Sequence, residues 1–470
     1  MKSFNFKGVL FPVIILIIFI FYSLINAQEI LVVIRSLCGI VILLFIAFIF
    51  SSNKNSIDYN TILWGISLQI LMGFFVLNTS IGYEIFKDIS FFVSKLLDFT
   101  RVGTNFVFGD LGNRLSNTNA FEKTVQNFPS INTLGELNLG FFAFTVLPVV
   151  IFVSSLSAIL YYLGVLQFVV LIFARILKYF LKISGAESLA TTANIFIGQT
   201  EAPLIVRPYI PKMTNSELLV LMTGGMATVS GSVLVAYIGI LQKHPIIGPT
   251  IGVHLITASV MAAPAAIVVA KIVYPEKLTP QTQDSAKINI KTDDVNIIDA
   301  ASRGALEGLQ LALNIMGMLI AFIAIIALCN YLIGTCFDNA LLALGIKPLH
   351  LSLEKIFAFI FWPFAFLIGV PVEECFKVAT LLGEKLVINE FVAYLHLGKV
   401  MTSLSERSFI LASYALCGFA NFSSIAIQIG GIGGIAPNRR HDLARFGIRA
   451  MIGGTIVSYI NAAIASIFIL

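Results

Sequence analysis

The sequence predicts an all-α polytopic membrane protein that contains an inverted repeat, with two re-entrant helical hairpins and two broken transmembrane helices. Three observations lead to this fold class. The 470 residues are 58% hydrophobic and only 12% charged. Several apolar runs reach the length of about 20 residues that a helix needs to cross a bilayer. The same order of elements also occurs twice along the chain.

The composition excludes several classes of protein. Soluble domains are about 45–50% apolar and about 25% charged, whereas this chain has a mean hydropathy of +0.93. A soluble enzyme, a disordered chain and a nucleic-acid-binding protein are therefore excluded, despite the net charge of +5. The excess of Lys and Arg instead fits loop charge on one side of a membrane. The five cysteines have no paired spacing, so we predict neither a disulfide framework nor a zinc site.

The first apolar run covers residues 8–26 and has two interpretations. Lys2, Lys7 and the small residues before Gln28 resemble a signal peptide, but the length of the run favours an uncleaved helix. In both cases Gln28 faces outside. Further spans are predicted at 30–50, 62–79, 140–163, 217–241, 248–273, 308–335 and 443–470, and residues 408–430 form an apolar region with many small and polar side chains.

The distribution of Lys and Arg sets the orientation, because positive loops stay inside. Lys54, the stretch 271–303 and the cluster 438–441 then all lie inside. This assignment is consistent only if segments 185–210 and 356–394 each enter and leave from one side. Both segments are too polar for a simple span, and non-helical backbone at membrane depth is tolerated where it is buried in protein or lines a cavity. We therefore predict two re-entrant hairpins.

Two amphipathic stretches, 84–110 and 164–182, are expected to lie along the membrane interfaces. The whole chain then divides into five parts: N-terminal scaffold helices at 1–79, interfacial helices with a scaffold helix at 80–182, a first transport repeat at 183–273, an inner loop with a long scaffold helix at 274–355, and a second transport repeat at 356–470.

Each hairpin is followed by a helix that glycine and polar residues interrupt. The first interruption is Gly224–Ser232, and the second is Cys417–Ser424 with a glycine cluster at 430–434. Glycine weakens a helix by about 1 kcal/mol relative to alanine. Small residues in a single helix also serve close helix packing. Two interrupted helices, each next to a hairpin, indicate instead an inverted-repeat secondary transporter whose site lies near the bilayer midplane.

Two glutamates are candidates for that site, Glu201 in the first hairpin and Glu390 in the second. A carboxylate at membrane depth costs roughly 2.5–3.5 kcal/mol on insertion scales, so it indicates function. Glu373 and Glu374 lie beside Lys377, and we interpret them as interfacial or neutralised by that lysine.

The polar residues around these glutamates suit a neutral solute. Gln199, Thr200, Asn421 and Ser424 can accept hydrogen bonds from hydroxyls and can donate to or accept from a heterocycle. No Arg or Lys stands in a position to clamp a phosphate. Asn194 and Thr228 add hard oxygen atoms that suit a cation such as Na⁺ in a symport scheme. The residues alone thus indicate a cation-coupled transporter of a polar, neutral solute.

Three motifs resemble those of concentrative nucleoside transporters: Asn-Ile-Phe-Ile-Gly-Gln-Thr-Glu-Ala-Pro-Leu at 194–204, Gly-Glu-Lys at 383–385 followed by Asn-Glu-Phe-Val-Ala-Tyr at 389–394, and Cys-Gly-Phe-Ala-Asn-Phe-Ser-Ser at 417–424. The resemblance runs from about residue 40 to the C-terminus. It implies an integral protein of the plasma (inner) membrane, a homotrimer, and elevator-like movement of a transport subdomain against a scaffold.

The resemblance also implies roles for individual residues. Gln199, Thr200 and Glu201 would face the nucleobase, and Val233 would line the base pocket. Glu390, Asn421 and Ser424 would bind the ribose, with Phe419 nearby. The side chains of Asn194 and Thr228, with the carbonyls of Ile197 and Val229, would hold Na⁺. Thr228 stands where some bacterial relatives have serine. Some relatives use protons, in which case Glu201 or Glu390 would carry the proton.

The sequence therefore predicts a Na⁺-coupled nucleoside symporter, with an H⁺-coupled symporter as the alternative. An intramembrane hydrolase would need a nucleophile beside a base or a metal set, and no His or Cys adjoins either glutamate. A channel would share the hairpins but would not accumulate solute. The choice between purine and pyrimidine stays open, because Gln199 and Thr200 can serve either base.

Overall fold

The computed structural model describes Pro12 and residues 30–109, 142–283, 294–344 and 351–469. Within these ranges the regular structure is entirely helical. Seven of the described helical segments are long and apolar enough to cross a membrane. The predicted all-α polytopic fold is therefore confirmed, while the predicted first helix at 8–26 lies outside the described residues apart from Pro12.

The first half of the chain follows the predicted order of spans. The helices are α2 (Ile30–Ile49), α3 (Tyr59–Asn78), α4 (Ser80–Phe108), α6 (Phe142–Thr145), α7 (Leu147–Tyr162) and α8 (Val165–Leu181). Helices α4 and α8 correspond to the two amphipathic stretches. The predicted span at 140–163 is interrupted between α6 and α7, where Pro148 occupies the first turn of α7. Proline is favoured there because N–H groups in the first turn of a helix have no partner within the helix. The N–H that proline lacks therefore costs no hydrogen bond.

The first repeat comprises α9 (Gly185–Ala193), α10 (Ala202–Ile205), α11 (Asn215–Ala227), α12 (Gly231–Leu241) and α13 (Ile251–Val273). Helices α9 and α11 both begin with a capping box, formed by Ser184 with Glu187 and by Thr214 with Glu217. Such boxes satisfy backbone N–H groups that a helix start leaves unpaired. The turn between α9 and α10 holds the residues of the first motif.

The second repeat comprises α15 (Leu353–Leu367), α16 (Cys375–Val387), α17 (Glu390–Val400), α18 (Glu406–Leu416), α19 (Phe422–Ile435) and α20 (Arg440–Phe468). The predicted hairpin at 356–394 therefore has the wrong bounds, because most of α15 falls inside it. Gly369, with a φ of +98°, and Pro371 separate α15 from the hairpin, whose arms are α16 and α17. Helix α15 packs against α16 as α8 packs against α9.

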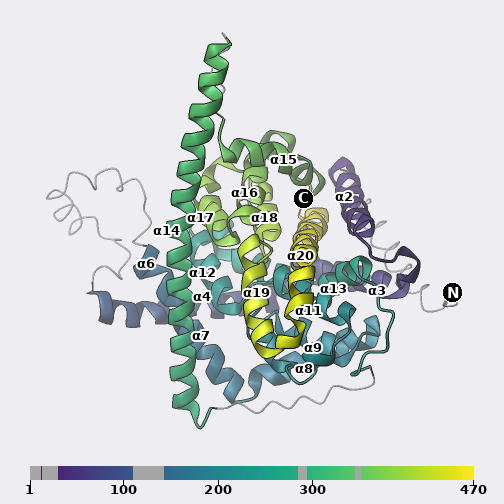
Figure 1. The fold of residues 1–470 in the computed structure, drawn as a ribbon. Helices are drawn as coiled ribbons and strands as arrows, with labels where there is room; N and C mark the ends of the chain where they lie inside the picture. The colour runs from purple at the N-terminus through teal and green to yellow at the C-terminus, as the bar shows by residue number, and fades with distance from the viewer. Residues whose placement is uncertain (1–11, 13–29, 110–141, 284–293, 345–350, 470) are drawn as a thin grey trace.

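The two repeats enter the molecule from opposite ends. In Figure 1, α8 and α9 lie at the lower end of the molecule, and α15 and α16 lie at the upper end. This arrangement agrees with the inverted order that the sequence predicts. It also directs the turn of each hairpin toward the middle of the molecule, where the interrupted helices run.

A long helix, α14 (Ile297–Ala343), lies along one side of the molecule (Figure 1). It starts before the predicted span at 308–335 and has 47 residues, which at 1.5 Å per residue makes it about 70 Å long. Helix α7 packs against it, whereas α2 packs against α20 and α3 against α13. The N-terminal helices assigned to the scaffold thus contact the repeats, and α7 packs both on α14 and on α12 of the first repeat.

Candidate functional site

The two helix breaks contact each other directly. Residues 228–230 separate α11 from α12, and residues 417–421 separate α18 from α19. The backbone N–H of Phe419 donates to the carbonyl of Thr228 at 3.2 Å. Gly418 has a φ of +145°, and a Cβ there would lie 2.9 Å from the carbonyl oxygen of Ala227. Glycine is required at this position because a side chain would both strain the backbone and collide with the other break.

Glu390 lies at the tip of the second hairpin and is buried, with 6% of its surface exposed. Both of its carboxylate oxygens receive a hydrogen bond. Asn421 Nδ2 donates to Oε2 at 2.7 Å, and the Tyr237 hydroxyl donates to Oε1 at 3.1 Å. Asn421 belongs to the second break and Tyr237 to the helix after the first break. Glu390 is thus bonded to both repeats, as a carboxylate at membrane depth requires.

The tip of the first hairpin reaches the same region. Gln199 Nε2 donates to Ser424 Oγ at 3.2 Å, and the Ser424 N–H donates to Asn421 Oδ1 at 2.9 Å. Asn421 is the N-cap of α19 and also donates to Glu390. Gln199, Ser424, Asn421 and Glu390 therefore form one connected set, which we call the inter-repeat network. It joins the two hairpin tips that the sequence places 191 positions apart, at residues 199 and 390.

The remaining predicted substrate residues lie around this network. Glu201 precedes α10 and is exposed, with its carboxylate folded over the backbone of Gly198, where a Cβ would collide with Oε2. Val233 is buried on α12, and Phe419 is half-buried in the second break. Thr200 is half-buried, with its methyl group facing Gly431 of α19. Glu201 and Glu390 therefore differ in environment, one exposed and one enclosed.

The four predicted cation ligands flank the contact between the first hairpin and the first break. Asn194 is fully buried, and neither atom of its amide has a hydrogen-bond partner among the described residues. A Cβ on Gly224 would lie 3.2 Å from Asn194 Nδ2, so this amide packs against the last turns of α11. Thr228 Oγ donates to the Gly224 carbonyl at 2.9 Å, which leaves its lone pairs free to accept.

A buried amide without a partner costs about 1–3 kcal/mol, so a ligand for the Asn194 oxygen would stabilise this region. The carbonyls of Ile197 and Val229 receive no hydrogen bond from the described part of the chain. Neutral oxygen ligands suit a hard cation rather than a transition metal. Among the described residues, no group of three or more His, Cys, Asp and Glu is arranged to hold a metal ion. The donor set therefore fits Na⁺.

Two polar residues at the site were not predicted to contribute. Tyr237 lies in an apolar run of the sequence and was not predicted as a site residue, although its hydroxyl donates to Glu390. Lys385 is 1% exposed, and its ammonium donates to the Ala415 carbonyl and to Ser458 Oγ, both at 2.9 Å. A cation near the C-terminal end of α18 interacts favourably with the negative end of the helix dipole. Lys385 therefore stabilises the end of α18, where the second break begins. The signal available for Lys385 was its place in the Gly-Glu-Lys motif at 383–385.

Glu374 has a different partner from the one expected. It accepts hydrogen bonds from the N–H of Ser405 at 2.8 Å and from Ser405 Oγ at 2.7 Å. Lys377 instead donates to the Ser403 carbonyl at 2.8 Å. Glu374 therefore joins the start of the second hairpin to the start of α18, and Lys377 acts on it through its charge rather than through a hydrogen bond.

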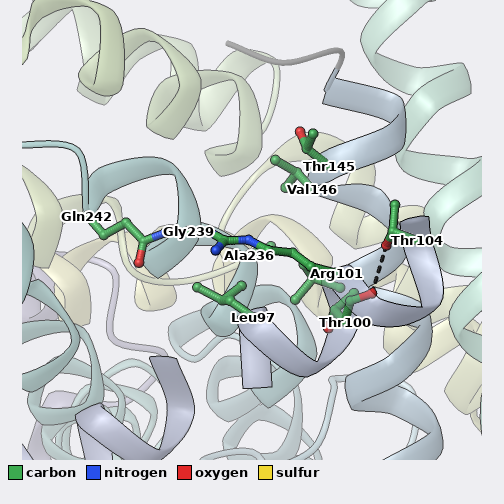
Figure 2. A pocket seen from close by; sticks show the side chains of 10 residues that line it. Leu97, Thr100, Arg101, Thr104, Thr145, Val146, Ala236, Gly239 and Gln242 are labelled. Atoms are coloured by element: carbon green, nitrogen blue, oxygen red, sulfur yellow. Dashed lines mark hydrogen bonds between the residues drawn. The ribbon is translucent and has the colours of Figure 1, made fainter. Parts of the chain in front are cut away.

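A separate cavity lies between α4, the α6–α7 segment and α12. Figure 2 shows Arg101 of α4 reaching toward α12 near Gln242, with Thr104 Oγ donating to the Thr100 carbonyl at 2.9 Å. None of the residues lining this cavity belongs to the inter-repeat network. The cavity is therefore distinct from the predicted solute site.

Family models match most of the chain. Residues 38–111 match the "Na+ dependent nucleoside transporter N-terminus", residues 143–243 match "Nucleoside recognition", and residues 254–466 match the "Na+ dependent nucleoside transporter C-terminus". The structure of CNTnw in an inward-facing substrate-bound state superposes with a TM-score of 0.82 at 38% identity, covering 93% of this chain and 98% of CNTnw. The chain belongs to the concentrative nucleoside transporter family.

Relatives of this concentrative nucleoside transporter occur in bacteria and mammals. The "Uncharacterized transporter YutK" of Bacillus subtilis is 41% identical, over 93% of this chain and all of the relative. "Solute carrier family 28 member 3" of Mus musculus is 38% identical over 98% of this chain, which spans 62% of the mouse protein. Family membership makes the chain a nucleoside transporter of the plasma membrane and not an enzyme, which confirms the sequence-based predictions of family, class and location.

Proposed function

We propose that this concentrative nucleoside transporter imports nucleosides together with Na⁺, in a site formed by both hairpin tips and both helix breaks. The observation that carries the proposal is the inter-repeat network beside the unpartnered amide of Asn194. These contacts support a polar solute site next to the proposed cation ligands. The "Na+ dependent" family description supports the choice of ion.

The ribose is proposed to bind at Glu390, Asn421 and Ser424. Glu390 already accepts one hydrogen bond at each oxygen, but an ionised carboxylate has about four acceptor positions. Ribose hydroxyls can therefore add to Glu390 without displacing Tyr237 or Asn421. Charge-assisted bonds of this type are roughly twice as strong as bonds between neutral groups.

The nucleobase is proposed to lie toward the first hairpin, at Gln199, Thr200 and Glu201. Val233 would supply an apolar wall and Phe419 an aromatic ring near the sugar. These elements come from both repeats, so a bound nucleoside would contact the two hairpins and the two breaks at once. This arrangement couples binding to the relative position of the repeats.

The coupling ion is proposed to bind to the side chains of Asn194 and Thr228 and to the carbonyls of Ile197 and Val229. When bound, Na⁺ supplies a positive charge that connects the turn of the first hairpin to the first break. Asn194 ends α9, and Gln199 lies in the same turn. The chain itself therefore links the cation ligands to the base-facing amide over five residues, from 194 to 199.

Movement is proposed to be elevator-like, in a homotrimer. Helices α7 and α14 would form the scaffold, because they pack on each other and α14 leaves most of its apolar surface exposed. Helices α2 and α3 pack against α20 and α13, so we now assign them to the moving part. The boundary predicted at residue 79 would then separate two moving helices, α2 and α3, from the scaffold, instead of dividing the scaffold into two parts.

A thermal-stability measurement tests the ion assignment. A ligand that binds only the folded state raises its melting temperature. We expect Na⁺, compared with an equal concentration of choline, to raise the melting temperature of the purified protein and to tighten uridine binding. Asn194→Leu should abolish both effects of Na⁺. Its stability in choline should be retained, since the substitution removes a buried amide that has no partner.

The matched control is Asn330→Leu. Asn330 donates to both carboxylate oxygens of Glu354 at 3.0 Å, away from the inter-repeat network. Its loss should lower the melting temperature but preserve the response to Na⁺. A wild-type protein that ignores Na⁺ and binds uridine more tightly at low pH would instead support the H⁺-coupled alternative.

A further inference from the structure

Gln428 connects three elements of the site but carries no role in the function derived above. It lies on α19, one turn after Ser424, and is 1% exposed. Its Nε2 donates to the Met222 carbonyl of α11 at 3.0 Å and to Gln199 Oε1 at 3.1 Å. Gln428 therefore joins the second broken helix to the first broken helix and to the tip of the first hairpin.

These contacts determine which way both amides point. A backbone carbonyl can only accept a hydrogen bond, so Gln428 must direct its NH₂ group toward Met222. The same NH₂ group faces Gln199, which must therefore present its oxygen to Gln428. The Nε2 of Gln199 then lies on the other side, 3.2 Å from Ser424 Oγ. The orientation of each amide follows from this network of partners.

The backbone leaves little room for another arrangement. A Cβ on Gly225 of α11 would lie 2.8 Å from Gln428 Nε2 and 2.9 Å from the Cβ of Gln199. Both glutamines therefore pack directly on the main chain of α11, and the close approach depends on glycine at position 225. This packing fixes the position of the Gln199 side chain and leaves only a half-turn of its terminal amide, which exchanges oxygen and nitrogen within the same space.

The fixed orientation leaves one hydrogen-bond donor of Gln199 available. Gln199 Nε2 carries two hydrogens, of which Ser424 takes one. Gln428 Oε1 is buried and has no hydrogen-bond partner among the described residues. A donor at Gln199 matches uracil, whose carbonyl O4 accepts a hydrogen bond. Cytosine presents the opposite pattern, an amino group that donates and a ring nitrogen that accepts.

We propose that Gln428 is a specificity-determining positioning residue, which holds Gln199 as a hydrogen-bond donor and so favours oxo-nucleosides such as uridine and inosine. Cytidine and adenosine, which carry an amino group at the corresponding edge, are disfavoured. The inference rests on the proposed function, because it requires Gln199 to face the base. A wrongly paired buried polar group weakens binding enough to give about tenfold discrimination.

Competition against radiolabelled uridine, with purified full-length protein in Na⁺, tests this inference. The wild type should bind uridine at least about tenfold more tightly than cytidine, and inosine more tightly than adenosine. Gln428→Glu removes the donor NH₂ group, so Gln199 should turn its own NH₂ toward position 428 and present its oxygen to the base. The uridine-to-cytidine affinity ratio should then fall at least tenfold. Gln428→Met, which imposes neither orientation, should bring the ratio close to one.

The matched control is Gln69→Met. Gln69 is another buried glutamine, whose Nε2 lies 2.5 Å from Asn461 Oδ1 between α3 and α20. Its replacement should change stability without changing the affinity ratio. A wild type that binds uridine and cytidine equally, or Gln428 variants that keep the wild-type ratio, would overturn the inference. A wild type that binds no nucleoside would instead overturn the proposed function. If Gln428→Glu does not fold, the wild-type ratios and Gln428→Met still decide.

Discussion

The surroundings of Glu390 make its role testable by a single substitution. Glu390→Gln keeps the size of the side chain but removes the charge that strengthens hydrogen bonds from ribose hydroxyls. A hydrogen bond to a charged group contributes about 1.5–3 kcal/mol, so uridine affinity should fall roughly 10- to 150-fold. The affinity for 2′,3′-dideoxyuridine, which lacks the two hydroxyls, should change far less. Equilibrium binding to the purified variant measures both values.

Glu374→Gln is the control for that prediction. Glu374 belongs to the same hairpin region but accepts hydrogen bonds from Ser405 at the start of α18. Its substitution should leave the affinity for uridine unchanged. If Glu390→Gln also binds uridine with wild-type affinity, the ribose assignment is wrong. An equal loss for uridine and the dideoxy compound would point to a structural effect on the hairpin.

The residues that the sequence did not predict share a physical cause. Tyr237 contacts a carboxylate 153 positions away, and Gln428 contacts an amide 229 positions away. Local pattern and spacing do not report such pairs, because the fold alone brings them together. The motif residues Gln199, Asn421 and Ser424 were found because they stand where apolar helices are interrupted. Tyr237 and Gln428 lie inside regular helix and gave no comparable signal.

At the level of elements, the two breaks depend on glycine for their contact. Gly418→Ala should disrupt this contact, because the backbone φ is +145° and Ala227 O, Met226 O and Ser458 Oγ surround the added Cβ at 2.9–3.0 Å. We expect a loss of about 1–3 kcal/mol in stability, the usual cost of such local strain. A lowered melting temperature and loss of uridine binding would show it.

Gly430→Ala provides the comparison on the neighbouring helix. Gly430 lies within α19, and no atom lies within 4 Å of a Cβ built there. Alanine is the better helix former by about 1 kcal/mol, so this variant should be as stable as the wild type or more stable. Equal tolerance of alanine at positions 418 and 430 would contradict the proposed contact between the breaks.

The bounds of the elements show what the sequence can and cannot predict. Both breaks were predicted, because glycine and hydroxyl residues interrupt otherwise apolar helices. They were drawn too long, since residues 224–227 and the glycine cluster at 430–434 are helical. The second hairpin was drawn too long, since α15 is apolar along most of its length and resembles a hairpin arm in hydropathy alone. Gly369 and Pro371 were the local signal that separates them. The length of α14 was underestimated because its first turns are polar.

At the scale of the whole molecule, the elevator proposal requires α12 to slide past α7, and we assign α4, which packs on both α7 and α12, to the scaffold as well. A Cβ on Gly239 of α12 would lie 3.4 Å from a methyl group of Leu97 on α4. In a variant without the five native cysteines, a disulfide between Leu97→Cys and Gly239→Cys should stop uptake while uridine binding persists. Reduction of the disulfide should restore uptake. Full uptake by the crosslinked protein would show that α4 and α12 move together.

The central claim is that the two hairpin tips and two breaks form one site that couples a nucleoside to Na⁺. Uptake of radiolabelled uridine by proteoliposomes tests it most directly, under an inward Na⁺ gradient, an inward pH gradient, or neither. We predict accumulation of intact uridine above the external concentration under the Na⁺ gradient alone, and loss of that accumulation when the gradient is dissipated. Accumulation driven only by the pH gradient, simple equilibration as in a channel, or release of free uracil would contradict the account.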